Sequence, residues 1–282
     1  MAALPLRGLS YLVTGSTDGI GKHTATLLAS KGATVLMHGR DRKRGEAALR
    51  DVEEASKGKG QLELYINDLS SLEGVRNLAK DVSAKHPTLH CIINNAGAYA
   101  QQRSMSPDGY ELTFAVNVLA PFLLNGLLLE NVKQFKDESG RSCGKIVNVA
   151  SILHAQGGGH LDFGNLQQEK GFDSHAAYAL SKLCLVCLTY SLAEKLGSTP
   201  TVNCCHPGTI NTKMLTTGWG AFGSDLADAK DEFDLATNKS WAHTTGKYFV
   251  DSKPQRSAAT TYNSAIRAQL WEHCAKLTGF NY

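Results

Sequence analysis

Tyr178 and Lys182 stand four residues apart and form the pair in this sequence that is best suited to chemistry. Residues at that spacing lie on one face of a helix, one turn from each other. An ammonium group beside a phenol favours the phenolate. At about 4 Å the attraction is worth roughly 4 kcal/mol in a water-poor site, but only about 1 kcal/mol in bulk water. The pair therefore predicts a proton donor if the rest of the chain excludes water, whereas on a solvated helix face the same spacing has no chemical meaning.

A glycine-rich turn near the N-terminus could bind a phosphate. Residues 10–14 predict a short buried strand and residues 22–31 predict a helix. A turn between two such elements lets the backbone approach a pyrophosphate, which then binds the unpaired amides at the helix N-terminus. The spacing Gly-x-x-x-Gly-x-Gly is a weak signal by itself, because it also fits a turn that only redirects the chain. The candidate phosphate-binding residues are Gly15, Ser16, Thr17, Gly19, Ile20 and Gly21.

A basic cluster follows the next predicted strand, residues 33–37, where a dinucleotide fold reads the adenosine ribose. An NAD site would place a carboxylate there, but this chain has Arg40, followed by three more basic residues at 42–44. Such a cluster suits a 2′-phosphate and predicts NADP(H) in preference to NAD(H). Asp41 could oppose that reading, although its place before the helical pattern 42–54 also predicts an N-cap. The cluster could equally be a solvated helix start, yet cations are unfavourable at a helix N-terminus.

Strand and helix patterns alternate to the end of the chain. This alternation predicts an α/β fold: one domain, residues 1–282, with a Rossmann-type doubly wound parallel sheet and helices on both faces. Ligands bind such sheets at the carboxyl ends of the strands. The further strands are predicted at residues 62–66, 89–93, 145–149, 202–205 and 247–250, and the further helices at 72–85, 107–135, 174–196 and 257–277.

Five motifs in this order resemble the short-chain dehydrogenase/reductases, and the likeness runs from about residue 6 to residue 279. They are Thr14-Gly15 with Gly19-Ile20-Gly21, Asn94-Asn95-Ala96-Gly97, Val147-Asn148-Val149-Ala150-Ser151, Tyr178 with Ser181-Lys182, and His206-Pro207-Gly208. Residues 106–111, 161–163, 246–249 and 270–271 are similar to the retinol-dehydrogenase-like branch of that superfamily.

The resemblance implies a catalytic set of four residues. Tyr178 would donate a proton to the substrate oxygen in reduction and accept one in oxidation. Lys182 would lower the pKa of that phenol and hold the nicotinamide ribose. Ser151 would donate a hydrogen bond to the reacting oxygen, and Asn117 would position a water that links Lys182 to solvent. A cap at Ser151 and a buried amide at Asn117 are the purely structural alternatives.

The resemblance also assigns contacts to a bound nicotinamide dinucleotide. Asp68 and Leu69 would lie against the adenine, Ile210 and Thr212 would contact the carboxamide, and Asp68 could equally be an N-cap for the residues from Ser70 onward. The remaining expected cofactor contacts are Asn95, Ala96, Gly97, Tyr178, Lys182, Pro207 and Gly208.

Apolar residues near these motifs predict a small, largely apolar carbonyl or alcohol substrate. A retinoid, a steroid, a lipid aldehyde and a xenobiotic ketone all remain open. His154 could bond a polar group of the substrate or could be satisfied by the backbone or solvent, and the run 157–159 predicts a mobile glycine loop. The expected pocket walls are Tyr99, Ala100, Leu153, His154 and the stretch 212–233 with Trp219 and Phe222.

Composition excludes several other classes of function. A net charge of +3 over 282 residues does not indicate nucleic-acid binding. The seven cysteines have no metal-binding spacing, so we expect no metal and reduced cysteines. Residues 112–129 carry no charge, but polar residues and a proline interrupt them, so a buried helix at a subunit contact is expected and not a membrane span.

The resemblance places that helix and the Tyr178 helix in a dimer interface, which predicts a homodimer or homotetramer. With a short N-terminus before the first strand, a cytoplasmic protein is expected. The sequence thus favours an NADP(H)-dependent oxidoreductase. The alternative is a nucleotide-binding regulatory protein without turnover, which would be expected to lack one of Asn117, Ser151, Tyr178 or Lys182.

Overall fold

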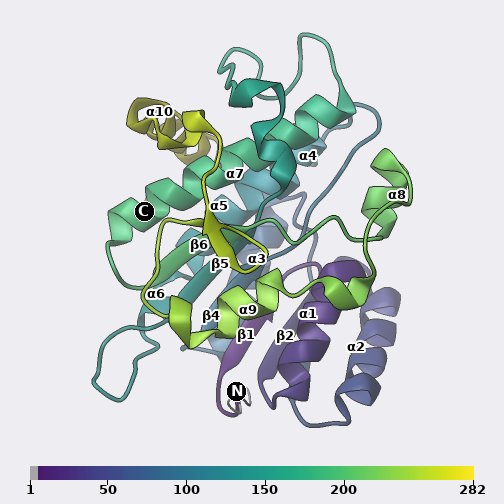
Figure 1. The fold of residues 1–282 in the computed structure, drawn as a ribbon, viewed down its shortest axis with the longest axis vertical. Coiled ribbons are helices and arrows are strands. Elements are labelled where there is room, and N and C mark those ends of the chain that lie inside the picture. Colours follow the sequence, from purple (N-terminus) through teal and green to yellow (C-terminus); the bar gives the residue numbers. More distant parts are fainter. Residues whose placement is uncertain (1–5) are drawn as a thin grey trace.

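The computed structural model describes residues 6–282, and its centre is an eight-stranded sheet (Figure 1). The strand order is β3-β2-β1-β4-β5-β6-β7-β8; each pair is parallel except β7 and β8. The doubly wound α/β fold predicted from the alternation is confirmed, while the antiparallel strand β8 was not predicted. The strands are β1 (Ser10–Val13), β2 (Thr34–Gly39), β3 (Gln61–Ile66), β4 (Cys91–Asn94), β5 (Lys145–Val149), β6 (Thr201–Cys205), β7 (Tyr248–Val250) and β8 (Lys253–Gln255).

The helices connect these strands and continue beyond the last one (Figure 1). The α-helices are α1 (Gly19–Ser30), α2 (Arg42–Ser56), α3 (Leu72–Lys85), α4 (Leu112–Phe114), α5 (Ala120–Leu127), α6 (Leu129–Lys133), α7 (Ser174–Leu196), α8 (Lys213–Trp219), α9 (Asp231–Thr237) and α10 (Ser264–Thr278). A π-helical turn, η1 (Ala115–Leu119), joins α4 to α5, and four 3₁₀-helices are η2 (Ile152–Gly159), η3 (Leu226–Asp228), η4 (Lys239–Trp241) and η5 (Ala259–Tyr262).

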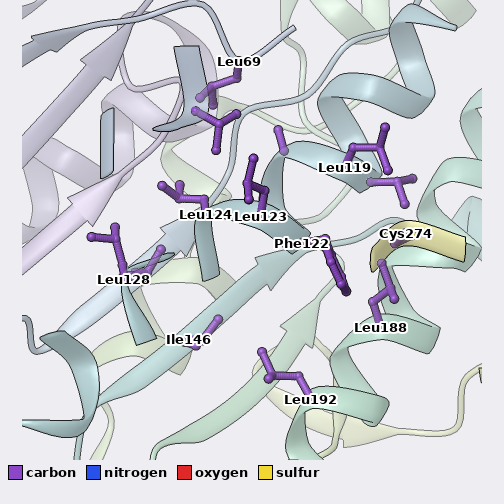
Figure 2. Packing of buried hydrophobic residues seen from close by; sticks show 14 of the residues in the cluster. Leu69, Leu119, Phe122, Leu123, Leu124, Leu128, Ile146, Leu188, Leu192 and Cys274 are labelled. Carbon is purple, nitrogen blue, oxygen red and sulfur yellow. The ribbon is translucent and has the colours of Figure 1, made fainter. Parts of the chain in front are cut away.

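Apolar side chains cover both faces of the sheet, because successive residues of a strand point to opposite sides. In β1, Tyr11 and Val13 pack in the core that α1, α2 and α9 contribute to, whereas Leu12 packs in the core of α3, α5, α7 and α10. Figure 2 shows the second core, in which Leu123 of α5 and Leu188 of α7 gather near Ile146 of β5. Both faces of the sheet are therefore covered mainly by apolar side chains.

The long helix α7 is covered within the chain itself. Its residues 177–179 and 181–193 are buried, and α10 packs against it. Beyond α10 the chain turns back onto α5, where a Cβ added at Gly126 would lie 2.1 Å from the Phe280 ring and the Tyr282 hydroxyl donates to the Phe122 carbonyl. Among the described residues, α7 is the one helix long and apolar enough to cross a membrane, yet 89% of its apolar window is buried in the chain, which is typical of a core helix.

Three predicted segments differ from the structure. The helix expected over 107–135 begins at Leu112, because the Glu111 carboxylate accepts from the amides of Thr113 and Phe114, and it breaks at the π turn before Pro121. The helix expected over 257–277 is divided, since the Asn263 side chain caps α10. The glycine run 157–159 lies in the 3₁₀-helix η2, so its prediction as a loop was wrong.

Candidate active site

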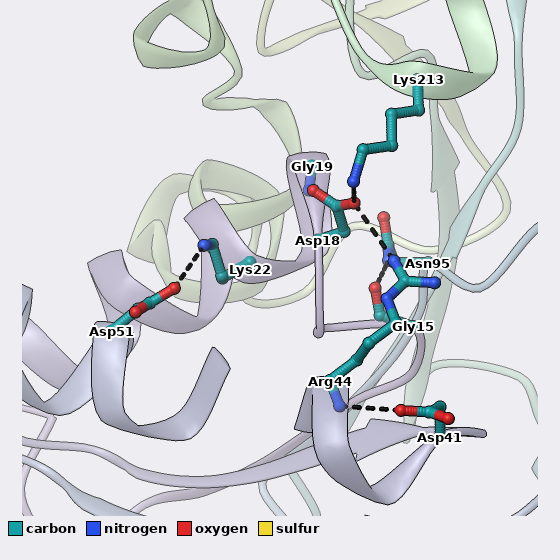
Figure 3. Close-up of polar contacts among 9 residues, drawn as sticks. All are labelled: Gly15, Asp18, Gly19, Lys22, Asp41, Arg44, Asp51, Asn95 and Lys213. Carbon is teal, nitrogen blue, oxygen red and sulfur yellow. Dashed lines mark hydrogen bonds and ion pairs between the residues drawn. The ribbon is translucent and has the colours of Figure 1, made fainter. Parts of the chain in front are cut away.

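The glycine turn after β1 and the loop after β4 form one floor at the carboxyl edge of the sheet. Asn95 Nδ2 donates to the carbonyls of Thr14, at 2.8 Å, and Gly15, at 3.1 Å (Figure 3). A Cβ at Gly21 would lie 2.2 Å from Asn95 Nδ2, and one at Gly15 would lie 2.8 Å from Ala96 Cα. Glycine is required at both positions because the two loops touch. The glycine-rich turn and the Asn-Asn-Ala-Gly motif are therefore explained by the same contact between loops.

A buried histidine of β2, which was not predicted from the sequence, accepts a hydrogen bond from the glycine turn. His38 Nδ1 accepts from the Gly15 amide at 3.2 Å, and its Nε2 lies 3.0 Å from the Asn67 carbonyl. Burial lowers the pKa of His38 to about 4, so the ring is neutral at physiological pH. A single histidine in a strand carries no motif, and only the fold brings it under the glycine turn.

Asp18 links the glycine turn to two cations from other elements (Figure 3). Its carboxylate lies 2.5 Å from Lys213 Nζ of α8 and 3.2 Å from a guanidinium nitrogen of Arg44 in α2. The hydrogen bond from Lys213 is the largest of the contributions that lower the pKa of Asp18. Asp41 accepts from the Arg44 amide at 2.8 Å, which confirms it as the N-cap of α2. Arg40 follows β2 with an exposed side chain.

The predicted catalytic residues come together at the same edge of the sheet and are buried. The exposed fractions of Ser151, Tyr178 and Lys182 are 7%, 8% and 4%. Lys182 Nζ donates to the Val149 carbonyl at 2.8 Å and lies 5.5 Å from the centre of the Tyr178 ring. The Ser151 hydroxyl accepts from the Leu153 amide at 3.2 Å, so this serine is both an N-cap of η2 and a neighbour of the phenol.

Burial dominates the protonation of this pair. It raises the pKa of Tyr178 to about 12, with the Ser151 hydroxyl acting in the opposite direction. It lowers the pKa of Lys182 to about 8, although the Glu232 carboxylate opposes that shift. The Lys182 ammonium donates to the Val149 carbonyl, and the lowering of the Tyr178 pKa expected from it stays a prediction for the site with its cofactor bound.

Asn117 ties the loop after β4 to α7. Its Oδ1 accepts from the Ala98 amide at 2.7 Å, and its Nδ2 donates to the Ala98 carbonyl at 3.0 Å and to Ser181 Oγ at 2.9 Å. The side chain is therefore committed to protein partners. Pro121 has no N–H, so the main-chain carbonyl of Asn117 has no α-helical donor four residues on. The water expected beside Asn117 stays a prediction.

Three further buried amides lie behind the site. Asn94 Nδ2 donates to Asn125 Oδ1 at 2.7 Å and to Asn148 Oδ1 at 2.8 Å, and Asn148 Nδ2 donates to Thr189 Oγ1 at 2.9 Å. These bonds join β4, α5, β5 and α7. The sequence shows Asn94 and Asn148 inside recognisable motifs, but nothing in it indicates that they pair with each other.

Aromatic rings cover the phenol. The ring centres of Trp219 and Tyr99 lie 5.4 Å and 6.0 Å from that of Tyr178, and 4.7 Å from each other. Tyr99 and Trp219 are thus placed as the expected pocket walls require. Phe222 is 66% exposed, and its place in the pocket wall stays a prediction. His154 bonds the backbone of the chain, which agrees with the alternative of a satisfied histidine.

The other predicted cofactor residues also lie at this edge. Asp68 accepts from the Ser70 amide at 3.0 Å, but the N-cap of α3 is Ser71, so Asp68 closes the turn before the helix. Thr212 caps α8, and its methyl group would contact a Cβ at Gly19, at 3.4 Å. The remaining residues of this group occupy the ends of β3 and β6 and the loops after them: Leu69, Pro207, Gly208 and Ile210.

Comparison with known proteins agrees with this geometry. The sequence profile of the short chain dehydrogenase family matches residues 10–219, so the chain belongs to the short-chain dehydrogenases, oxidoreductases that bind a nicotinamide cofactor. Within the family it stands in the retinol-dehydrogenase-like branch.

The similarity to individual relatives extends over nearly the whole chain. It is 34% identical to human retinol dehydrogenase 11, over 99% of this chain and 88% of that one, and 32% identical to human polyprenol dehydrogenase, over 95% and 84%. Among solved structures, a protein from Mycobacterium paratuberculosis superposes with a TM-score of 0.78 at 27% identity, covering 100% of this chain and 97% of that one. A short chain dehydrogenase from Escherichia coli CFT073, complexed with NADPH, gives 0.70 at 25% identity, over 87% and 97%.

Proposed function

We propose that this chain is an NADP(H)-dependent oxidoreductase that transfers hydride between the nicotinamide and a largely apolar carbonyl or alcohol. The observation that carries the proposal is the buried group of Ser151, Tyr178 and Lys182, which lies beside a glycine turn at the carboxyl edge of the sheet. Buried residues capable of proton transfer next to a dinucleotide turn support redox chemistry.

The residues present fit a dinucleotide with a 2′-phosphate. The first turn of α1 offers backbone amides to a pyrophosphate. Arg40 is exposed at the end of β2, and Arg44 lies near the glycine turn through its pair with Asp18. The Escherichia coli relative complexed with NADPH is consistent with this choice. Asp18 would repel a phosphate, and its two cation partners offset that repulsion.

The chain supplies the proton transfer and the electrostatics. When bound, the nicotinamide gives or receives the hydride. In reduction, the Tyr178 hydroxyl donates its proton to the substrate oxygen, and a pKa of about 12 keeps the donor protonated at neutral pH. The Ser151 hydroxyl donates a hydrogen bond to the same oxygen as its charge develops. In oxidation Tyr178 must first lose its proton, and Lys182 is the cation beside its ring.

The substrate proposal follows from the surroundings of Tyr178. The rings of Tyr99 and Trp219 lie 6.0 Å and 5.4 Å from that of Tyr178, which supports a reacting group that enters among largely apolar surfaces. Retinol and polyprenol, which appear in the names of relatives, are apolar alcohols. We propose a substrate of that general character and leave its skeleton open.

A substrate panel tests the proposal. Apolar aldehydes, ketones and alcohols are each mixed with the protein and NADPH, NADH or their oxidised forms, and nicotinamide absorbance is followed. Turnover that is faster with NADP(H) and disappears in Tyr178→Phe is the expected result. Tight NADPH binding with no turnover on any member would instead favour the regulatory alternative, and no binding of either cofactor would reject both.

A further inference from the structure

Two histidine rings hold the backbone on the two sides of Ser151. His154 lies in η2, and its Nδ1 is 2.7 Å from the Ser151 carbonyl. His206 lies just after β6, and its Nδ1 accepts from the Ile152 amide at 3.4 Å. The exposed fractions of the two rings are 3% and 8%. One ring therefore fixes the carbonyl of the serine, and the other fixes the amide that follows it.

The partners of each ring define its tautomer. A carbonyl can only accept, so His154 carries its proton on Nδ1; its Nε2 then accepts from the Ala258 amide at 3.1 Å. His206 has the opposite form, because its Nδ1 faces an amide donor and must be unprotonated. A second proton on either ring would direct an N–H at the amide of Ala258 or Ile152, so both contacts exist only with neutral rings.

Through Ala258, the serine is connected to the C-terminal part of the chain. Ala258 lies between β8 and η5, and the neighbouring Ser257 hydroxyl is 2.8 Å from the Tyr190 hydroxyl of α7. The end of η2 also touches this segment, because a Cβ at Gly159 would lie 2.9 Å from Ala258 Cβ. A segment anchored on α7, the helix of Tyr178, thus supports the helix that Ser151 begins.

We infer that His154 and His206 are positioning residues for Ser151, and that they set the direction of its hydroxyl toward the reacting oxygen only while both rings are neutral. The inference deepens the proposed function and rests on it. Neither ring needs to touch the substrate. A displacement of about 1 Å of a hydrogen-bond donor can reduce a rate by about 10²-fold, which is enough to make such support visible in kcat.

The surroundings keep both rings neutral over the physiological range. Burial is the main cause that lowers the pKa of His206 to about 4; the Asp251 carboxylate opposes this and His154 adds to it. Burial also lowers the pKa of His154, against the opposing contact with the Ser151 carbonyl, while the Tyr248 ring packs 4.6 Å from it. Acid should therefore break the His206 contact only as pH falls toward 4, and the His154 contact only below the ordinary range for histidine.

Paired variants distinguish the loss of the histidine hydrogen bonds from the change in side-chain volume. His206→Asn keeps an acceptor at the position of Nδ1, whereas His206→Leu removes it. His154→Phe removes both contacts of that ring. His243→Phe, at an exposed position, is the control for replacing a histidine.

The measurements are kcat and KM for a substrate of the parent protein, the NADPH dissociation constant by fluorescence, and ¹⁵N histidine spectra. We expect kcat to fall roughly 10- to 100-fold in His154→Phe and His206→Leu, with NADPH binding within about twofold and partial rescue in His206→Asn. The spectra should show an Nδ1–H tautomer that is lost in His154→Phe.

Three results would overturn the inference: unchanged kcat in folded His154→Phe and His206→Leu, equal losses in His206→Asn and His206→Leu, or an Nε2–H tautomer at His154. A parent protein without turnover on any carbonyl would reject the proposed function instead, and the tautomer assignment would still test the geometry around Ser151.

Discussion

Replacing Lys182 by methionine should make the protein more stable while it abolishes catalysis. The lysine is buried, and its pKa falls from the ordinary value of 10.5 to about 8. At 1.36 kcal/mol for each unit of pKa, that fall corresponds to about 3 kcal/mol of destabilisation whenever the amine is charged. Methionine fills a similar volume without the charge, but it leaves the Val149 carbonyl unpaired, which costs about 1–2 kcal/mol. The expected net gain is about 1–2 kcal/mol.

The stability difference between the parent and Lys182→Met should depend on pH. Because the folded-state pKa lies below the unfolded one, the penalty is complete below pH 8 and disappears as pH rises toward 10.5. Thermal unfolding of the two proteins should therefore differ by roughly 2–6 °C at pH 7, with Lys182→Met the more stable. At pH 10 the remaining penalty of about 1 kcal/mol no longer exceeds the cost of the unpaired carbonyl, so the advantage of Lys182→Met should disappear or reverse.

Lys80→Met, at an exposed position of α3, is the matched control and should show neither effect. The reasoning fails if Lys182→Met is less stable than the parent at pH 7, or if its advantage is the same at both pH values. Either result would mean that the charged amine is better solvated or better paired in the folded chain than its burial indicates.

Four further predictions concern the site and the assembly. Tyr178→Phe should lower kcat by about 10²–10⁴-fold and change NADPH binding by less than about 1 kcal/mol, as measured by kinetics and fluorescence titration. NADPH should bind more tightly than NADH by about 1.5–3 kcal/mol, and Arg40→Asp should reverse the order; equal dissociation constants in the parent would contradict this. Lys213→Met removes the bond from α8 to Asp18 and should weaken NADPH binding several-fold in stopped-flow titration, whereas an unchanged constant would show that α8 needs no such tie. The parent should sediment as a monomer, since Phe280 and Tyr282 cover α5, and removal of residues 280–282 should favour a dimer; a parent dimer insensitive to the deletion would reject this.

The last of these is the alternative to the homodimer or homotetramer expected from the sequence, and both stay predictions. The uncharged stretch 112–129 is too apolar to leave in water, and sequence alone could not say whether a second copy or the same chain covers it. In the structure α10 and the C-terminal residues provide that cover. The physical premise was right, and the identity of the covering surface depended on long-range packing that has no local signature.

In the active site too, local motifs could be predicted from the sequence but contacts between distant elements could not. Its motifs were predictable because glycine turns and polar residues at strand ends must meet at the carboxyl edge of a parallel sheet. Lys213 and Asp18 are separated by 195 residues, and neither belongs to a pattern that would join them. The π turn at Asn117 was also hidden, because a change from α to π hydrogen bonding leaves the apolar periodicity of the helix almost unchanged. The sequence therefore predicts which residues lie at the carboxyl edge of the sheet, but not which side chains from different elements contact each other.

The amide cluster behind the site limits how this chain can change. Asn94, Asn125 and Asn148 are buried and bond one another, so an apolar residue at Asn94 removes the donor to Asn125 Oδ1 and one of the two donors to Asn148 Oδ1. Each unpaired group costs about 1–3 kcal/mol, and recovery requires the neighbours to change as well. Substitutions at these positions should accordingly be tolerated together more readily than singly. Among homologous chains, the three positions should vary as a set, even though they lie on a strand, a helix and another strand.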